Sequence, residues 1–312
     1  MGVYYSIYKL GLMRHLLISN GFMPTDTLYA VLMVAAVAVC IVSGYFLGGL
    51  NFAIIVSKKK YGVDVRDFGS GNAGMTNMRR TFGKKAGHIT LIGDAIKAIV
   101  ACIIGYLLLG LFGAYIAGFF SVVGHMFPAK YKFKGGKGVV CTAVVVLMTT
   151  AGNPTFYYIP VVFLILIAAF AIIVLGSRFI SLGSIIAVLL YPLVLNAFQN
   201  LGMNTDKLIE LFEKDEQALY TYSLLHAEDG FYIVIAFAIT VLVVFMHREN
   251  IKRLLNKEES KFEFHMSGKK TLYEQKLDDD AEAAAAADSV KSLADKPNPN
   301  TSLFRSISPR ST

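Results

Sequence analysis

The sequence is poor in charge and in cysteine, and it lacks the patterns of several protein classes. Only 17% of its 312 residues are charged and 55% are hydrophobic, a departure from soluble averages toward long apolar runs. Apolar and polar residues do not alternate with a period of two, which argues against a transmembrane β-barrel. Three cysteines, an odd number that lies in apolar runs, predict neither a disulfide framework nor a metal cluster. We therefore expect an all-α integral membrane protein.

The long apolar stretches predict about seven transmembrane helices. Roughly 20 apolar residues cross a hydrocarbon core of about 30 Å as a helix, which satisfies its own backbone polar groups. One stretch, residues 138–151, is shorter and is interpreted as a half-span that its neighbours support. The candidate spans are residues 28–56, 89–109, 110–127, 138–151, 155–176, 179–199 and 230–246.

The composition divides the chain into three parts. Residues 1–27 form an N-terminal extension without the apolar core and cleavage site of a signal peptide, and we expect an interfacial helix there. Residues 28–261 form the membrane-embedded domain. Residues 262–312 are polar and predict a disordered cytoplasmic tail with one or two alanine-rich helical turns.

The basic residues predict the topology. They gather in residues 57–88, 129–138 and 247–261 and at Arg178, and the apolar stretches between these groups are long enough for two crossings each. All four groups then lie on one face, which the positive-inside bias makes cytoplasmic. The opposite loop, residues 200–229, has seven acidic residues and two lysines. We expect the N-terminus outside and the C-terminus inside, and the net charge of +8 needs no nucleic-acid partner to explain it.

The stretch "GSGNAGMTN", residues 69–77, is a polar loop between two apolar segments. Glycine permits positive φ and lets backbone amides approach an oxyanion, and short polar side chains add hydrogen-bonding groups. A flexible linker is the alternative, but linkers seldom concentrate Asn, Thr and paired arginines, so we predict anion binding. The candidates are Ser70, Gly71, Asn72, Gly74, Thr76 and Arg80, with Gly69, Asn77 and Arg79 beside them.

A second loop, "KYKFKGGKG" at residues 130–138, combines the same residue types. Lys137 stands between Gly136 and Gly138, with Gly135 before them, as expected where a lysine meets a phosphate pressed against backbone. The GxxxxGK[ST] spacing of a Walker A motif is missing. Contact with lipid headgroups is the alternative, and it explains the three earlier lysines better than Lys137.

Two further polar segments follow apolar stretches. "SRFISLGS" places Ser181 and Ser184 on one helix face, and "HRENIKRLL" places His247 and Asn250 three residues apart. Buried serines can simply bond to backbone, and a terminal His-Arg pair can be only an interfacial anchor. Because both segments and both loops emerge at the same face, we expect a composite phosphate site at the lipid boundary.

Asp94 and Lys97 lie inside an apolar stretch, where each lone charge costs about 2.5 to 3.5 kcal/mol on insertion scales. Their i, i+3 spacing allows them to pair. Either they face a water-filled cavity or they brace the polar site near its cytoplasmic entrance, and we favour bracing.

In these segments the chain resembles the PlsY family of bacterial acyl-phosphate:glycerol-3-phosphate acyltransferases. The segments "DVRDFGSGNAGMTNMRRTFGKKAG", "GHMFPAKYKFKGGKGV", "SRFISLGS" and "HRENIKRLL" follow the family's order and spacing over roughly residues 44–258. The resemblance implies acyl transfer from acyl phosphate to the 1-position hydroxyl of sn-glycerol 3-phosphate, giving lysophosphatidic acid and inorganic phosphate in phospholipid synthesis. It also implies a multi-pass protein among the lipids of the bacterial inner membrane, with no cofactor, metal or obligate protein partner.

The resemblance also assigns roles by matched motif. The phosphate of the acyl donor would be held by Ser70, Gly71, Asn72, Gly74 and Thr76. Glycerol 3-phosphate or the reacting groups would be held by Arg80, Lys137, Ser184, His247 and Asn250. Further substrate-binding candidates are Gly135, Gly136 and Ser181. His247 either acts as a base or only binds substrate, since the donor phosphate can itself accept the hydroxyl proton.

The chain departs from the family at the end of the first apolar stretch. The family usually reads Gly-Ser-Ile-Pro-Phe there, whereas this chain reads "GGLNF", with Gly49 and Asn51 in place of Ser and Pro. A transporter or channel for an organic phosphate is the main alternative function, although no internal repeat favours it. Acyl-CoA-dependent acyltransferases commonly carry a His followed five residues later by Asp, and no histidine of this chain has such a partner.

Overall fold

The computed structural model describes residues 2–21, 26–151, 159–212, 229–262 and 270–294 of the chain. They fall into two compact units, Met1–Ser267 and Gly268–Thr312. The described residues form α-helices and two short 3₁₀ turns, with no strand among them, so the all-α prediction is confirmed for this part of the chain. The helices are α1 (Gly2–Ser19), α2 (Thr27–Gly48), α3 (Phe52–Tyr61), α4 (Met75–Phe82), α5 (Lys84–Met126), α6 (Val139–Ala151), α7 (Ile159–Ser177), α8 (Ile180–Phe212), α10 (Asp229–Met246), α11 (Arg248–Leu255) and α12 (Leu272–Ala294).

Helix α5 is a hairpin of two antiparallel arms. Its backbone leaves helical geometry at Leu109 and Gly110, where Gly110 has a φ of +61°. Lys97 Nζ lies 2.8 Å from His125 Nδ1, whereas a straight helix would separate these residues by about 42 Å. The turn therefore falls where the sequence divides the predicted spans 89–109 and 110–127.

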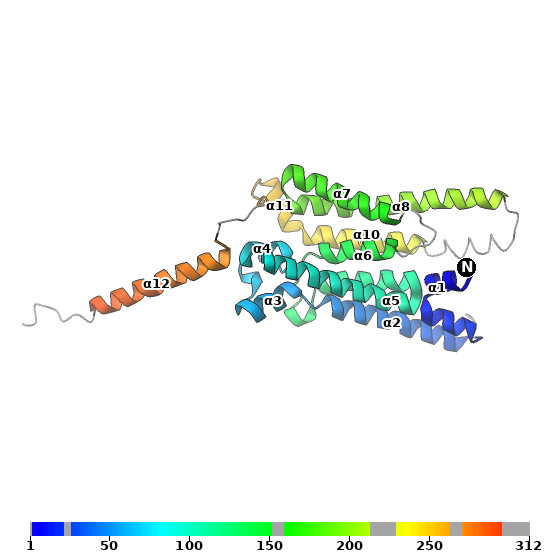
Figure 1. The fold of residues 1–312 in the computed structure, drawn as a ribbon, viewed down its shortest axis with the longest axis horizontal. Helices are drawn as coiled ribbons and strands as arrows, with labels where there is room; N and C mark the ends of the chain where they lie inside the picture. The colour runs from blue at the N-terminus through cyan, green and yellow to red at the C-terminus, as the bar shows by residue number, and fades with distance from the viewer. Residues whose placement is uncertain (1, 22–25, 152–158, 213–228, 263–269, 295–312) are drawn as a thin grey trace, which may run out of the picture. The chain divides into compact units, whose positions relative to one another are not determined.

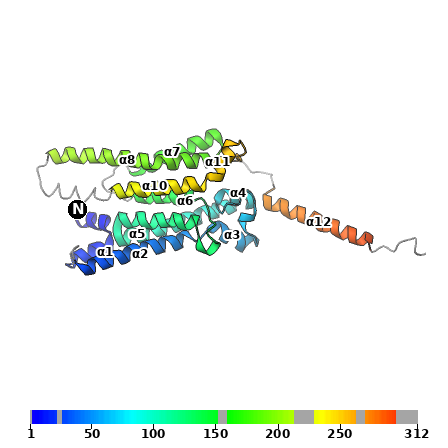
Figure 2. The same cartoon turned by 180° about the vertical axis from the view of Figure 1, so that it is seen from behind.

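The hairpin lies at the centre of the first unit. Helix α5 contacts α1, α2, α3, α4, α6 and α10, and α8 contacts α7 and α10. Figures 1 and 2 show α7, α8 and α10 along one side of the bundle and α2 along the other, with α5 and α6 between them. The largest buried apolar cluster joins α5, α6, α8 and α10 around Tyr115, Tyr191 and Ile239.

Glycines allow α2 to approach the second arm of α5 closely. A Cβ added to Gly44 would overlap the Ala117 carbonyl, one on Gly48 would overlap the Ser121 carbonyl, and one on Gly124 would overlap the Tyr45 carbonyl. Small residues four apart are typical of close helix contacts in membranes. The contact between α2 and the second arm of α5, called here the α2–α5 seam, is therefore close because glycines leave room for the facing backbone.

The membrane crossings agree only partly with the sequence prediction. By length and apolar composition, three described helices can cross a membrane, Thr27–Tyr61, Lys84–Tyr131 and Ile180–Asn200, and a fourth is added if α10 and α11, bent by 56°, count as one. That criterion counts both arms of α5 as one helix and leaves out the shorter apolar helices α6 and α7. Outward-facing apolar residues such as Val34, Phe46 and Ile172 are 68–70% exposed, as expected of surfaces that face lipid.

Three segments differ from their predicted form. The first predicted span is divided into α2 and α3 by a break at residues 49–51. Helix α8 continues to Phe212, into the stretch predicted as a loop, and residues 213–228 of that loop lie outside the described part. In the second unit, α12 has 23 residues, more than the one or two turns that the alanine-rich sequence predicts, and residues 295–312 are not described.

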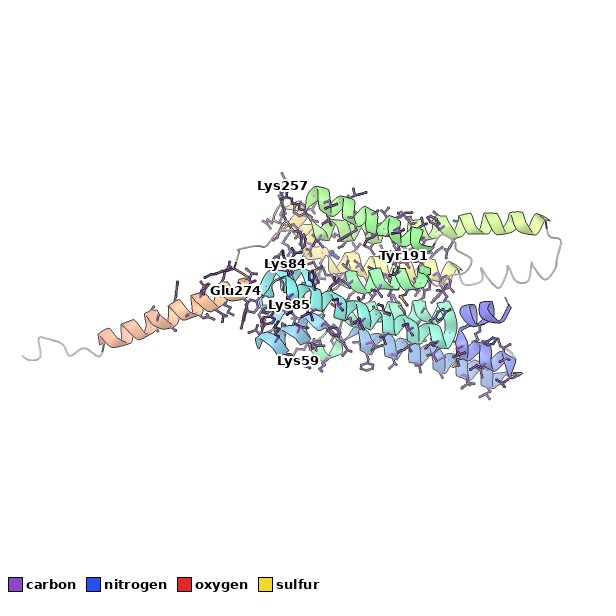
Figure 3. All side chains as sticks on the ribbon, in the orientation of Figure 1. Lys59, Lys84, Lys85, Tyr191, Lys257 and Glu274 are labelled. Carbon is purple, nitrogen blue, oxygen red and sulfur yellow. The ribbon has the colours of Figure 1, made fainter. Side chains whose placement is uncertain are left out.

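Polar segments gather at one end of the bundle. Figure 3 shows Lys59, Lys84, Lys85 and Lys257 at the end formed by α3, α4 and α11, with Tyr191 far from them along the bundle. Helix α1 lies at the opposite end (Figure 1). Residues of the basic groups 57–88 and 247–261, which the sequence assigns to one face, therefore lie at the same end of the bundle.

Gly48→Ala is expected to lower the free energy of unfolding by about 1 to 3 kcal/mol, the usual range for overpacking a close contact. The measurement is the shift of the unfolding midpoint of the purified protein in detergent. Gly176→Ala is the matched control, because a Cβ at this exposed helical position meets nothing within 4 Å. Equal midpoints for the two variants would contradict the close seam.

Candidate active site

The first glycine-rich loop is shaped by a buried asparagine. Asn77 Oδ1 accepts a hydrogen bond from the Ser70 amide at 3.0 Å, and its Nδ2 donates to the carbonyls of Val65 and Phe68 at 3.1 and 2.9 Å. Gly69 and Gly71, with φ of +56° and +68°, take the left-handed conformations that the turn requires. Asn77 thus supports the loop instead of offering its amide to a ligand.

The other residues of this loop are accessible. Ser70 and Gly71 are exposed, and Asn72, Gly74, Thr76 and Arg80 are partly buried. Gly74 is the N-cap of α4 and has no side chain, so no N-cap side chain bonds to the first amides of α4. Such a helix start, with Thr76 in its first turn, is suited to an anion.

The glycines of the second loop serve close packing. The amides of Gly135 and Gly136 donate to the carbonyls of Met126 and His125 at 3.0 and 3.1 Å. A Cβ on Gly135 would overlap the His125 carbonyl, and one on Gly136 would overlap the His125 ring. In the structure these glycines bring the loop against the end of α5 and so fix the backbone beside Lys137. Their contact with a phosphate, which the sequence pattern predicts, stays a prediction.

Lys137 meets the polar end of α11. Its Nζ donates a hydrogen bond to Asn250 Oδ1. Burial, together with the charges of Arg253 and Arg80, lowers the pKa of the Lys137 ammonium to about 8, although the Glu259 carboxylate opposes the shift. The guanidinium groups of Arg253 and Arg80 therefore lie close enough to Lys137 to disfavour its charged form.

Glu259 connects three of the polar groups. Ser181 Oγ and Asn250 Nδ2 each donate to Glu259 Oε1 at 2.6 Å, and Arg253 Nε donates to Oε2 at 2.8 Å. Burial raises the pKa of Glu259, but the hydrogen bonds from Ser181, Arg253 and Asn250 outweigh it and lower the pKa below its ordinary value. The ionised carboxylate thus joins the start of α8 to α11 and orients the Asn250 amide toward Lys137.

The segment after α11, residues 256–262, folds back over this region. The Phe262 amide donates to the Arg178 carbonyl at 2.7 Å, and the Arg79 guanidinium lies 4.3 Å from the centroid of the Phe262 ring. Arg79 therefore stacks on this segment, while Arg80 lies near Lys137. The role of Arg80, the substrate-binding candidate of the pair, stays a prediction.

His247 and Ser184 both bond to backbone. His247, 2% exposed and just beyond α10, has its Nδ1 2.8 Å from the Val243 carbonyl, so Nδ1 carries the proton and Nε2 of the neutral ring is an acceptor. Burial and then the Lys137 charge lower the pKa of His247 to about 4. Ser184 Oγ donates to the Ile180 carbonyl at 2.8 Å, which is the alternative considered for a buried serine.

A buried cluster lies directly behind the two loops. Lys97 Nζ is 2.8 Å from Asp94 Oδ1 and from His125 Nδ1, and it donates to the carbonyls of Gly48 and Leu50 at 2.9 Å. The predicted pairing of Asp94 with Lys97 is confirmed. Because the two carbonyls lie at the break between α2 and α3, the ammonium holds that break in place.

Asn51 attaches the first loop to the same break. Its Oδ1 accepts from the Ile54 amide at 3.1 Å and so caps α3, and its Nδ2 donates to the Ala73 carbonyl at 3.2 Å. His125, which contacts Lys97, carries the second loop through the bond from the Gly136 amide. Both loops are therefore fixed to one buried polar cluster.

Local sequence patterns do not indicate the roles of Glu259, His125 or Asn51. Glu259 stands in "NKEESK", a pattern typical of solvated surface, and only its position soon after the "HRENIKRLL" motif indicates that it lies near the site. Asn51 directly precedes an apolar run, which is a helix N-cap pattern.

Among the described residues no group of three or more His, Cys, Asp or Glu could hold a metal ion, and the absence of a metal stays a prediction.

Comparisons with known proteins give a consistent result. The family model described as glycerol-3-phosphate acyltransferase matches residues 38–257. The glycerol-3-phosphate acyltransferase of Bacillus subtilis is 32% identical over 225 residues, covering 72% of this chain and 97% of that protein. The enzyme of the same name from Carboxydothermus hydrogenoformans is 36% identical over 224 residues, covering 72% and 95%.

A solved structure has the same fold. The crystal structure of PlsY, an integral membrane glycerol 3-phosphate acyltransferase, in its glycerol 3-phosphate form has a TM-score of 0.56 and 30% identity, covering 73% of this chain and 96% of PlsY. Its lysophosphatidic acid form has a TM-score of 0.54 and 28% identity. Since the family model spans more than half of the sequence and the polar residues above converge at one end of a helical bundle, this chain belongs to the PlsY family of glycerol-3-phosphate acyltransferases and is an integral membrane acyltransferase.

Proposed function

We propose that this acyltransferase transfers a fatty acyl group from acyl phosphate to the 1-position hydroxyl of sn-glycerol 3-phosphate. The products are lysophosphatidic acid and inorganic phosphate. The forms in which PlsY was solved, with names that mention glycerol 3-phosphate and lysophosphatidic acid, support this acceptor and product.

The observation that carries the proposal is the surplus of positive charge around Lys137. Arg80 and Arg253 both lower the pKa of Lys137, and among the residues that the structure describes Glu259 is the acidic group that opposes them. A cluster with more cations than acidic groups is unfavourable by itself and becomes favourable when an anion enters. A phosphomonoester, which carries nearly two negative charges at neutral pH, is a ligand of the right charge.

The two loops then divide the substrates between them. The exposed first loop, with its positive-φ glycines and the start of α4, holds the phosphate of the acyl donor through Ser70, Gly71, Asn72, Gly74 and Thr76. The second loop and α11 hold glycerol 3-phosphate. The residues that bind glycerol 3-phosphate are Arg80, Lys137, Ser181, Ser184, His247 and Asn250, with Gly135 and Gly136 as the backbone that supports Lys137.

The reaction needs positioning more than it needs a strong base. The hydroxyl oxygen attacks the acyl carbon, the bond from that carbon to the phosphate oxygen breaks, and phosphate leaves with the electron pair. Holding two anionic substrates together and neutralising their charge supplies much of such a rate. A phosphate whose second pKa is about 6 accepts the hydroxyl proton more readily than His247, whose pKa is about 4. We assign the proton to the donor phosphate and a hydrogen bond from substrate to His247 Nε2.

The charge pattern supports a topology for this reaction. We propose seven crossings, counting the arms of α5 separately, with the N-terminus outside and the C-terminus in the cytoplasm of a bacterial inner membrane. The basic end of the bundle then faces the cytoplasm, and glycerol 3-phosphate, which is water-soluble, reaches the site from that side. No cofactor and no obligate protein partner enter this proposal.

The donor is tested on purified protein in detergent, offered glycerol 3-phosphate with palmitoyl phosphate or with palmitoyl-CoA and without added metal. Phosphate release and lipid product are measured together. We expect lysophosphatidic acid from the acyl phosphate alone. Product from palmitoyl-CoA alone would show that acyl-CoA, and not acyl phosphate, is the donor. If folded protein forms no product from either donor, the proposed reaction is refuted.

The KM for glycerol 3-phosphate should rise as the pH increases through about 8. Lys137 is charged below that pKa and loses its proton above it, so the anion loses a partner as the pH rises. Steady-state kinetics from about pH 7 to about pH 9.5 check this, with Lys137→Arg as control because arginine keeps its charge over that range. The same rise in Lys137→Arg would assign the titration to another group.

His247→Gln should lower kcat but leave measurable turnover. The glutamine amide can still hydrogen-bond to substrate, and the proposed mechanism does not require a base at this position. The KM for glycerol 3-phosphate is measured alongside kcat. Complete loss of turnover, with binding of glycerol 3-phosphate intact, would assign the proton transfer to His247 instead.

A further inference from the structure

The loop after α5 presents one aromatic ring between lysines. Phe133 is 61% exposed, and Lys130, Lys132 and Lys134 around it are exposed as well. A single exposed apolar residue is common on protein surfaces and indicates nothing by itself. The backbone that presents this ring, however, is unusual.

Two successive residues of the loop are left-handed. Lys132 and Phe133 have φ of +58° and +57°, a region that residues other than glycine seldom adopt. The amides of Tyr131 and Phe133 both donate to the Pro128 carbonyl at 3.0 Å, and the Lys132 amide donates to the Ala129 carbonyl at 3.2 Å. Such conformations persist where the surrounding structure imposes them, and they are concentrated at functional sites.

Arg66 holds the loop from outside. Its Nη1 donates to the Tyr131 carbonyl at 3.1 Å and to the Lys134 carbonyl at 3.0 Å, and its guanidinium lies 6.0 Å from the centroid of the Tyr131 ring. Asp64 in turn accepts from Arg66 at 2.8 Å. The loop is therefore a braced support for Phe133 rather than a flexible connection.

The base of the loop adjoins apolar surface of α2. Tyr45 Oη donates to the Phe127 carbonyl at 2.8 Å, directly before the loop. Phe46, the next residue of α2, is 68% exposed, and Leu50 beyond its end is 41% exposed. Because α2 belongs to a candidate membrane span, these outward-facing side chains face lipid. Figures 1 and 2 show the light-green segment after α5 at the edge of the bundle beside α3.

We infer that residues 130–134 form an interfacial anchor, in which Phe133 enters the acyl boundary of the bilayer while the three lysines contact anionic phospholipid headgroups. An aromatic ring flanked by long cationic side chains fits this boundary, since the ring needs hydrocarbon and the ammonium groups stay at headgroup level. A soluble acidic partner would satisfy the lysines but not the apolar surface of α2 beside them.

The anchor bears on the reaction because Lys137 follows it closely. Between them, Gly135 and Gly136 are bonded to the end of α5, so the loop and Lys137 form one rigid unit. The anchor then sets the depth of Lys137 relative to the bilayer, where an acyl chain from lipid and a phosphate from water must meet. This consequence rests on the proposed function, whereas the anchor itself does not.

The sequence contains no tryptophan, so Phe133→Trp creates a protein with a single reporter at this position. In vesicles of mixed phosphatidylcholine and phosphatidylglycerol we expect blue-shifted emission, strong quenching by lipids brominated high on the acyl chain, and weak quenching by aqueous iodide. Phe46→Trp, on the lipid-facing side of α2, gives the reference for lipid contact. Emission of a hydrated indole, quenched by iodide and unaffected by brominated lipid, would overturn the anchor.

Tryptophan itself favours interfaces, so a second variant tests the lysines. Lys130→Glu in the Phe133→Trp background should weaken quenching by brominated lipid several-fold in vesicles that contain phosphatidylglycerol, and little in pure phosphatidylcholine. Equal quenching of the two proteins in anionic vesicles would remove the lysines from the anchor.

The link to the reaction is tested with Phe133→Ser. In vesicles this variant should raise the KM for glycerol 3-phosphate, which Lys137 binds, several-fold, whereas in detergent it should match the unaltered protein. An unchanged KM for glycerol 3-phosphate in vesicles would overturn the role in setting the depth of Lys137. If the unaltered protein forms no product from acyl phosphate, the proposed function fails and the fluorescence result stands by itself.

Discussion

The active end of this protein depends on one buried ammonium group. Lys97 bonds to a carboxylate, to two main-chain carbonyls at a helix break and to the ring of His125. A charge in apolar surroundings is stable only when it is paired and hydrogen-bonded, and removing one partner leaves the other uncompensated. Because Asn51 and His125 attach a loop each to this cluster, the accuracy of both substrate loops follows from the same set of contacts.

Glycine has three distinct roles around this cluster. Gly69 and Gly71 supply left-handed backbone, Gly135 and Gly136 allow a loop to touch the end of α5, and Gly48 lets two helices meet. All three roles look alike in the sequence. The structure separates them: Gly48, Gly135 and Gly136 allow close packing, whereas Gly69 and Gly71 shape backbone that can face an anion.

Much of the arrangement could be predicted from the sequence. Long apolar stretches, four basic groups and two glycine-rich loops are local signals, and they indicated a helical membrane protein with phosphate-binding residues at one face. The role of Glu259 could not be predicted in this way, because its partner Ser181 lies 78 residues away and an exposed glutamate has the same local signature. The interruption at residues 49–51 was visible only as a departure from the family, since Lys97, which satisfies its carbonyls, lies in another helix.

The break between α2 and α3 also has a consequence for how the chain is assembled in the membrane. Ribosomal synthesis delivers residues 27–61 before α5, so the carbonyls of Gly48 and Leu50 enter the membrane ahead of the ammonium that later binds them. Lys97 and His125 lie on different arms of α5, and their contact forms only after the hairpin has closed. Helices α2 and α3, although synthesised before α5, therefore reach their final geometry only after the hairpin has closed.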